Sequence, residues 1–183
     1  MPEKTVYIKF FAGIDENSVK TLMNIVEQKL KEGATKFVLL VSSGGGNVFA
    51  GITAYNFLKG IPVEVETHNF GSAISIALVL FCAGKRRYSA PHATFLLHGV
   101  ESRFPQGVGL EEKQLEERLK GLQLDMENFA GIIAANTGKS EKEIMKAMLD
   151  RTTLNPEQAK EYGLVHEIKE LLFERGAELI SIQ

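Results

Sequence analysis

Three residues that lie far apart in the sequence carry the side chains that catalysis by a nucleophilic serine requires: Ser75, His98 and Asp150. A serine hydroxyl attacks a carbonyl carbon efficiently only when a base removes its proton, and histidine is the most frequent base. A carboxylate that accepts a hydrogen bond from Nδ1 of the histidine leaves Nε2 free for that task. Each residue also has a simpler interpretation. A serine can be a small residue that allows close helix packing, a histidine can be a polar residue at the end of a strand, and Asp150 could pair with its neighbour Arg151.

Three consecutive glycines, Gly44, Gly45 and Gly46, join a predicted buried strand to a predicted helix. Glycine lets the backbone take positive φ and approach a ligand without a Cβ in the way. Backbone N–H groups beside a helix N-terminus can hold an anion or the oxyanion that develops during acyl transfer. The run matches neither GxGxxG nor GxxxxGK[ST], the two glycine-rich phosphate motifs. A tight turn is the alternative interpretation.

Ser75 itself follows a second glycine junction, in which Gly71 connects a predicted strand to an apolar helix. At the start of that helix the backbone N–H groups favour negative charge, which suits a reactive hydroxyl. The spacing does not match the GxSxG turn of α/β-hydrolases. The other histidines fall in predicted loops or turns and carry less weight: His68, His92 and His166.

The composition excludes several classes of protein. With 44% hydrophobic and 24% charged residues and a formal charge of -2, the chain is typical of a globular protein and has no basic surface for nucleic acid. The single cysteine, Cys82, excludes an intramolecular disulfide and a cysteine-rich zinc site, and we expect no metal or organic cofactor. The longest apolar run, residues 73–83, is too short to span a membrane, and the start lacks a signal peptide. We expect a cytoplasmic protein.

Hydrophobic patterning predicts an α/β protein with one domain over residues 1–183. Predicted strands and helices alternate in the first half, which indicates a largely parallel sheet with helices on its faces and right-handed crossovers. A first helix begins at Asp15 or Asn17 and ends near Gly33. The expected strands are 6–11, 36–41, 63–67, 87–89, 94–97 and 165–168, and the further helices are 48–58, 72–82, 110–137, 140–149 and 156–162.

The predicted helix over 110–137 is unusually long and would reach roughly 42 Å. Its apolar residues repeat at heptad-like spacing. They are Leu115, Leu119, Leu122, Met126, Phe129 and Ile133. We expect part of this helix to project and to bury the apolar seam against another subunit. A helix packed wholly in its own core is the alternative.

Together these segments resemble the Clp protease proteolytic subunit family, serine peptidases on the crotonase-like fold, over about residues 5–167. Residues 42–48 stand where that family has Asn-Ser-Pro-Gly-Gly-Ser-Val, and residues 71–77 are similar to its nucleophile segment Gly-Gln-Ala-Ala-Ser-Met-Gly. His98 stands in place of the histidine of Ile-His-Gln-Pro, Asp150 begins a match to Asp-Arg-x4-Pro-Glu-Ala, and residues 161–165 also match. The sequence differs from the family at Ser42, Gly44, Ser72, Ile76 and Ala77, and Ala159 is displaced by one residue.

The resemblance implies a role for each site residue. Ser75 would be the nucleophile, His98 the base and Asp150 the acid that orients the base. The backbone N–H groups of Gly46 and Ile76 would form the oxyanion hole. The implied fold has repeated ββα units, a mostly parallel sheet, and a handle made of a strand and the long helix over residues 99–137.

The function implied by the resemblance is a serine endopeptidase that cleaves peptides or unfolded proteins inside a homo-oligomeric ring, alone or stacked as a double ring. The family's ring ATPase is a further partner that the resemblance allows. Family members usually engage it through an N-terminal helix and axial loop. Because this sequence begins almost at its first predicted strand, we expect that segment to be missing.

Three other functions remain open at this point. A crotonase-type enzyme acting on acyl-CoA thioesters would share the fold and the oxyanion hole. A non-catalytic ring subunit would keep the fold without the activity. A membrane-associated peptidase with a Ser–Lys dyad is the third, because Lys85 and Arg86 follow the Ser75 helix.

Overall fold

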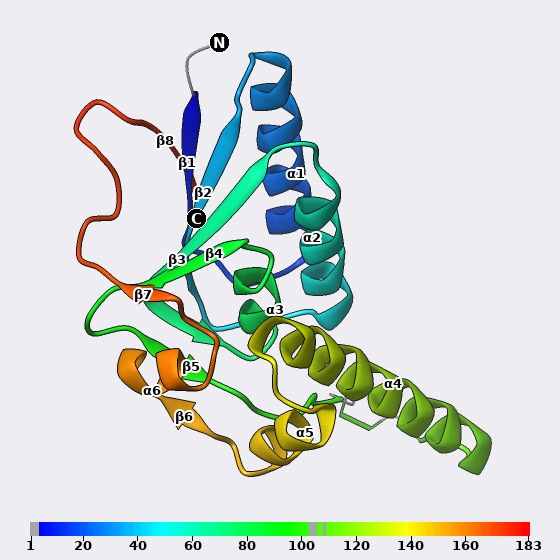
Figure 1. Cartoon of the computed structure of the whole chain (residues 1–183). Helices are drawn as coiled ribbons and strands as arrows, with labels where there is room; N and C mark the ends of the chain where they lie inside the picture. Colours follow the sequence, from blue (N-terminus) through cyan, green and yellow to red (C-terminus); the bar gives the residue numbers. More distant parts are fainter. Residues whose placement is uncertain (1–3, 103–105, 108) are drawn as a thin grey trace.

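The structure of the chain is a computed structural model that describes residues 4–102, 106, 107 and 109–183 (Figure 1). The strands are β1 (Thr5–Phe10), β2 (Lys36–Ser43), β3 (Glu64–Ile74), β4 (Arg86–Ser89), β5 (Thr94–Leu96), β6 (Thr153–Leu154), β7 (Glu167–Ile168) and β8 (Glu178–Ile182). The helices are α1 (Glu16–Lys31), α2 (Val48–Gly60), α3 (Ala77–Phe81), α4 (Glu112–Thr137), α5 (Glu141–Leu149) and α6 (Pro156–Glu161). In the described residues, no helix is long and apolar enough to cross a membrane.

The strands form one sheet in the order β6-β5-β3-β2-β1-β8, with β4 pairing with both β3 and β7. Among the described strands every pairing is parallel except that of β5 with β6. Helices α1 and α2 cover one face of the sheet, as Figure 1 shows. The largely parallel α/β architecture expected from the sequence is therefore confirmed.

The core lies between this sheet face and its helices. All of β2 except its first residue is buried, which explains its run of consecutive apolar residues. Burying a large apolar side chain contributes roughly 1.5–3 kcal/mol. The largest fully buried rings are Phe10, Phe37, Phe81, Phe95 and Phe129.

Helix α1 begins and ends as its sequence predicts. Asp15 caps it by accepting a hydrogen bond from the backbone N–H of Ser18 at 2.8 Å. Residues Val19, Leu22 and Val26 are buried. Just beyond its last turn, Gly33 takes the left-handed conformation at φ 86°, which glycine adopts without strain.

The helix predicted over residues 72–82 is wrong in its first part. β3 continues through Ser72, Ala73 and Ile74, which pair with Thr94–Leu96 of β5, and α3 comprises only Ala77–Phe81. A short apolar run can have the same composition in a strand and in a helix. Here the decisive factor is β5, which supplies hydrogen-bond partners for the backbone of β3.

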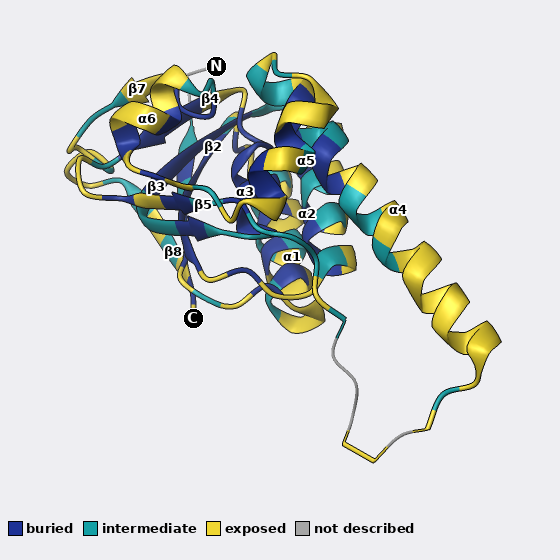
Figure 2. Ribbon diagram, turned by 90° about the horizontal axis from the view of Figure 1, so that it is seen from below, coloured by how far each residue is buried: buried dark blue, intermediate teal, exposed yellow. Residues whose placement is uncertain are grey.

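Helix α4 is confirmed close to its predicted limits. Near its C-terminal end Phe129, Ala130, Ile133 and Ala134 are buried, whereas Leu119 is 56% exposed. Figure 2 shows the exposed N-terminal half of α4 extending away from the body of the molecule. The strand expected before α4, in residues 99–109, includes residues 103–105 and 108, which lie outside the described residues. None of the described residues of that segment belongs to a strand.

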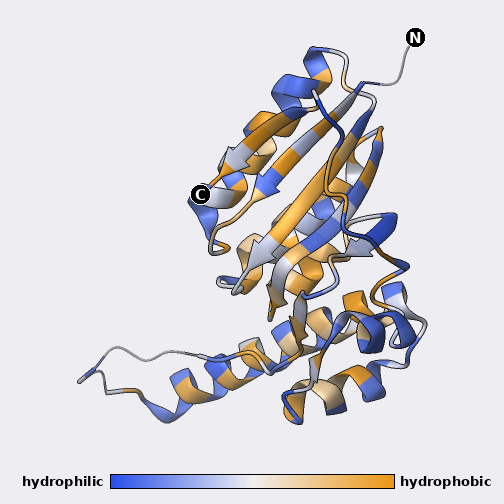
Figure 3. Ribbon diagram, turned by 90° about the vertical axis from the view of Figure 1, so that its left-hand side faces the viewer, coloured by the Kyte–Doolittle hydropathy of each residue, from blue (hydrophilic) through white to orange (hydrophobic). Residues whose placement is uncertain are grey.

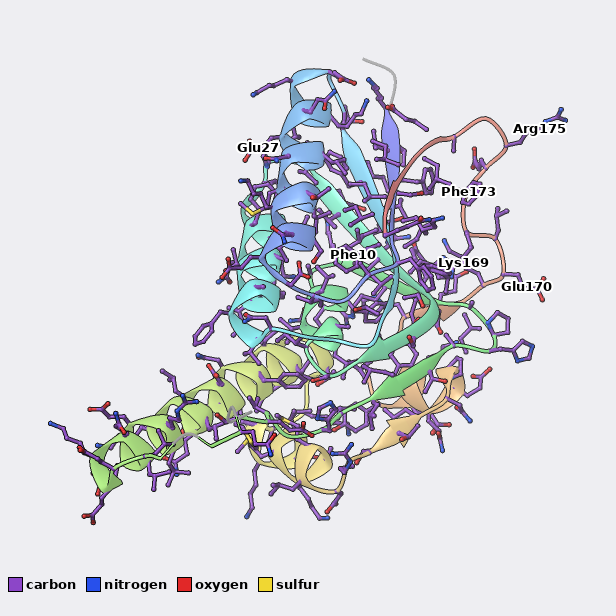
Figure 4. The ribbon with its side chains drawn as sticks, turned by 180° about the vertical axis from the view of Figure 1, so that it is seen from behind. Phe10, Glu27, Lys169, Glu170, Phe173 and Arg175 are labelled. Carbon is purple, nitrogen blue, oxygen red and sulfur yellow. The ribbon has the colours of Figure 1, made fainter. Side chains whose placement is uncertain are left out.

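The sequence patterning predicts no helix or strand after residue 168. Residues 169–177 cross the sheet face opposite α1 and α2, and β8 then pairs in parallel with β1 (Figure 3). The Phe173 ring lies 6.1 Å from that of Tyr7, and the Lys169 ammonium lies 3.3 Å from the centroid of Tyr88. In Figure 4 the side chains of Glu170 and Arg175 point away from the body of the molecule.

Candidate active site

Ser75 lies in a sharp turn between β3 and α3, at the carboxyl end of the parallel strands, where ligands bind in open α/β sheets. Its backbone N–H donates to the carbonyl of Leu96 at 2.9 Å, and its φ is 57°. A left-handed conformation costs a non-glycine residue roughly 1–2 kcal/mol, and such residues cluster at functional sites. The turn leaves Ser75 half-buried at the start of a buried helix.

His98 is positioned by the strand next to β3. The backbone N–H of Leu97 donates to the carbonyl of Thr152 at 2.9 Å, which fixes the chain immediately before His98. Nδ1 of His98 lies 2.7 Å from the carbonyl oxygen of Gly99. Because a carbonyl oxygen only accepts hydrogen bonds, Nδ1 carries the proton and Nε2 is left unprotonated in the neutral ring. This is the tautomer that a general base needs.

The glycine loop packs directly against Ser75. A Cβ added to Gly45 would lie 2.7 Å from the carbonyl oxygen of Ile74 and 2.9 Å from Cβ of Ser75. A Cβ on Gly46 would lie 2.2 Å from the carbonyl oxygen of Ile14. Both glycines also have positive φ, 90° and 150°. The close approach of this loop therefore requires glycine.

Two backbone N–H groups at this junction are available to a ligand. Within the described part of the chain, the N–H groups of Gly46 and Ile76 donate to no other group. The nitrogen of Ile76 lies 3.5 Å from the position that a Cβ on Gly45 would take, so the two segments are adjacent. Free N–H groups beside a nucleophile are the usual construction of an oxyanion hole.

These residues share one pocket of about 660 Å³. Ser75, His98 and Gly46, three of the five residues expected from the sequence, line it, and Ile76 follows Ser75 directly. The other lining residues are Gly44, Gly45, Val48, Val100, Glu101 and Arg151. Among the described residues no hydrogen bond joins Ser75 Oγ to His98. Such bonds are often long in ligand-free sites and shorten when substrate binds.

Asp150 is not brought into the pocket. It caps the C-terminus of α5, its side chain is 54% exposed, and its carboxylate pairs with Lys146 one turn earlier on the same helix. Such neighbours on one helix face meet without any tertiary contact. In this structure Nδ1–H of His98 instead donates its orienting hydrogen bond to the Gly99 carbonyl.

Sequence reasoning missed two charged residues of the pocket, Arg151 and Glu101. Arg151 reaches it because Thr153 and Leu154 pair with Leu96 and Phe95, which brings the chain two residues before β6 to the end of β5. No signal in the sequence revealed this pairing, since β6 is only two residues long. Across the described ranges, no three His, Cys, Asp or Glu side chains gather closely enough to hold a metal ion.

Comparison with known proteins places the chain in a family. The family model named Clp protease matches residues 4–171. The chain belongs to the Clp protease family. The ATP-dependent Clp protease proteolytic subunit 2 of Corynebacterium efficiens is 28% identical over 84% of this chain and 76% of the relative. Subunit 1 of Corynebacterium jeikeium is 30% identical over 71% of this chain and 68% of the relative.

A solved structure agrees with the fold. A point mutant of ClpP1 from Listeria monocytogenes superposes with a TM-score of 0.79 at 25% identity, covering 92% of both chains. This Clp protease chain therefore has the ClpP fold, which is crotonase-like. The low identities show a divergent member, and family membership supports a peptidase of the Clp type.

Proposed function

We propose that this protein is a serine endopeptidase that hydrolyses peptide bonds in peptides or unfolded proteins. One observation carries the proposal: Ser75 and His98 line a single pocket together with a glycine loop, in a chain of the Clp protease family. The pocket opens at the carboxyl end of the sheet, where an extended peptide can reach it. The reaction is acyl transfer to Ser75 followed by hydrolysis.

In the proposed mechanism Ser75 Oγ attacks the peptide carbonyl carbon while Nε2 of His98 takes its proton. The N–H groups of Gly46 and Ile76 donate to the oxyanion of the tetrahedral intermediate. His98 then gives the proton to the leaving amine, and the C–N bond breaks. A water molecule, deprotonated by the same nitrogen, hydrolyses the acyl-enzyme and releases Ser75.

The third member of the expected triad requires a rearrangement. Asp150 can orient His98 only after its carboxylate leaves Lys146. Until then the Gly99 carbonyl holds the His98 ring in the tautomer that the mechanism requires. A backbone carbonyl lacks the negative charge that stabilises an imidazolium, so it supplies orientation with less electrostatic support.

A second candidate function is a non-catalytic ring subunit of the same fold. The observation that favours it is the position of Asp150, outside the pocket and paired with Lys146. In that case the glycine loop and Ser75 would retain their conformation without turnover. The two candidates differ in whether Ser75 reacts.

The proposal includes the assembly. Residues 1–183 form one domain, and residues 99–137, which include α4, form the handle through which subunits of stacked rings meet. The exposed leucines of α4 support this role. The resulting chamber would lie in the cytoplasm and take peptides directly or from a ring ATPase.

The test is hydrolysis of internally quenched peptides by the assembled full-length chain. Ser75→Ala should lower kcat by at least about 10³-fold. Ser72→Ala, three residues earlier in β3, should retain activity and is the matched control. Equal turnover by the wild-type and Ser75→Ala proteins would contradict the proposal, and retained thioester hydrolysis in Ser75→Ala would indicate a crotonase-type enzyme.

A further inference from the structure

Two opposite charges face each other in the wall of the Ser75 pocket. Arg151 and Glu101 both line it, and Nη1 of Arg151 lies 3.8 Å from Oε1 of Glu101. The side chains are 63% and 60% exposed. At that separation and exposure an ion pair contributes at most about 1 kcal/mol, because water screens both charges.

The backbone holds Arg151 firmly beside His98. Its N–H donates to the carbonyl of Met148 at 3.2 Å, and the next residue, Thr152, both donates to Ala147 and accepts from Leu97. The φ of Arg151 is 52°, a left-handed conformation that costs a long side chain roughly 1–2 kcal/mol. With Ser75, Arg151 is one of two described non-glycine residues that have positive φ, and both line this pocket.

Most of the donor groups of Arg151 are unused. A guanidinium has five N–H groups in a planar fork that matches a carboxylate with two parallel hydrogen bonds. Across the described residues its side chain has one ionic partner, Glu101, and that contact is too long to be a hydrogen bond. Among the described residues that line the pocket of Ser75 and His98, Arg151 is also the only permanently charged cation.

We infer that Arg151 determines substrate specificity by binding a carboxylate of the peptide near the scissile bond. This inference rests on the proposed peptidase function and names the substrate class: peptides with an acidic side chain or a free C-terminal carboxylate at that position. In the empty site Glu101 takes the place of the substrate carboxylate. Its weak, exposed contact is readily exchanged for a bidentate one.

The side chain and the C-terminal carboxylate are distinguished by two sets of internally quenched peptides. In the first set the C-terminus is amidated and each residue flanking the scissile bond is in turn Glu, Gln or Lys. The second set places a free or an amidated C-terminus at increasing distance from the same bond. In one of the two sets, we expect kcat/KM for the peptides that carry the carboxylate to be higher by about 10-fold or more than for their uncharged counterparts.

Variants then assign that preference to Arg151. Arg151→Asn removes the charge while suiting the left-handed backbone, so it should fold and lose the preference. Arg151→Lys should keep part of it. Glu101→Gln should enlarge it, because a competing carboxylate is removed. Lys85→Gln breaks a comparable exposed pair, with Glu64 at 3.3 Å, outside the pocket and should change nothing.

Labelling of Ser75 by a fluorophosphonate probe in the same samples tests the peptidase function separately from the role of Arg151. If Ser75 is labelled and peptides are cleaved with no preference for carboxylates, the inference is wrong and the peptidase function stands. A preference that survives in Arg151→Asn also overturns the inference. If Ser75 is not labelled and no peptide is cleaved, both the function and the inference fail.

Discussion

At the scale of single residues, the site depends on a loop that has no room for a side chain at Gly45 or Gly46. Gly45 packs against Ser75, and the next residue of each segment, Gly46 and Ile76, carries an N–H group proposed for the oxyanion. A displacement of about 1 Å at a catalytic group can lower a rate by 10²-fold. The geometry of this contact therefore bears on activity more directly than on stability.

Gly45→Ala should lower kcat by about 10²-fold or more, because its Cβ would lie 2.7 Å from a backbone carbonyl oxygen and force the loop away from Ser75. Gly44→Ala is the matched control, since a Cβ there meets nothing within 4 Å. Peptide hydrolysis by the two variants measures the difference. Similar activities would show that the loop does not position the reacting groups.

Asp150→Asn should lower kcat by less than about 10-fold if the Gly99 carbonyl alone orients His98, as the structure has it. When an aspartate holds the histidine tautomer in a serine protease, the same change lowers kcat by about 10⁴-fold. Steady-state hydrolysis decides between these values. A loss near the larger value would mean that Asp150 leaves Lys146 and joins His98 in the assembled protein.

At the scale of elements, β3 is the strand on which the site depends. Its first half pairs with β4 and its second half, which leads to Ser75, pairs with β5. At the point of exchange the buried side chain of Asn69 donates to the Thr94 carbonyl at 3.0 Å and accepts from the N–H of Gly71 at 3.1 Å. These bonds satisfy backbone groups that the change of partner leaves unpaired.

The same strand carries a histidine under the C-terminal segment. His68 is fully buried, its ring lies 5.9 Å from that of Tyr88, and its two nitrogens have no hydrogen-bond partner among the described residues. Burial, with a smaller effect from the Lys169 charge, lowers the pKa of His68 to about 4. The folded protein therefore binds this proton less readily than the unfolded chain, whose histidine pKa is about 6.5.

Stability should consequently fall as the pH decreases from about 6.5 to 4. Above the unfolded pKa His68 is neutral in both states and the folded protein keeps its full stability. Below the folded pKa the free energy of unfolding is smaller by on the order of 3 kcal/mol. His68→Phe should flatten this part of the profile in denaturant unfolding at several pH values, whereas exposed His92→Gln should not. Parallel profiles for wild type and His68→Phe would contradict the assignment.

Sequence patterning predicted the elements whose signals are local. Asp15 and Gly33 mark the ends of α1, and the heptad-like seam marks α4, because caps and periodicity need no distant partner. The second half of β3 and the whole of β8 were missed, because a strand forms only where a neighbouring strand supplies hydrogen-bond partners for its backbone. Arg151 was missed for the same reason, since the β5–β6 pairing places it.

At the scale of the whole molecule, α4 presents apolar residues that the described chain does not cover. Leu115 and Leu119 are 49% and 56% exposed on the side of the helix that carries the seam. An exposed apolar stripe on a projecting helix is typical of an association surface. In the proposed assembly another subunit covers it.

Leu119→Glu should therefore dissociate the assembly into smaller species while the subunit stays folded, because a charge cannot be buried in an apolar interface without a partner. Asn128→Glu places the same charge on the opposite side of α4 and should leave the assembly intact. Light scattering after size-exclusion chromatography measures the mass, and circular dichroism checks the fold. An unchanged mass for Leu119→Glu would remove α4 from the interface.

In the proposed function the fold makes one particular hydroxyl, that of Ser75, reactive. Intact mass measurement after treatment with a fluorophosphonate, on the assembled wild-type, Ser75→Ala and Ser72→Ala proteins, tests it most directly. We predict a single adduct on the wild-type and Ser72→Ala chains and none on Ser75→Ala. An adduct that persists in Ser75→Ala, or an assembled wild-type chain that takes up no probe, would contradict it.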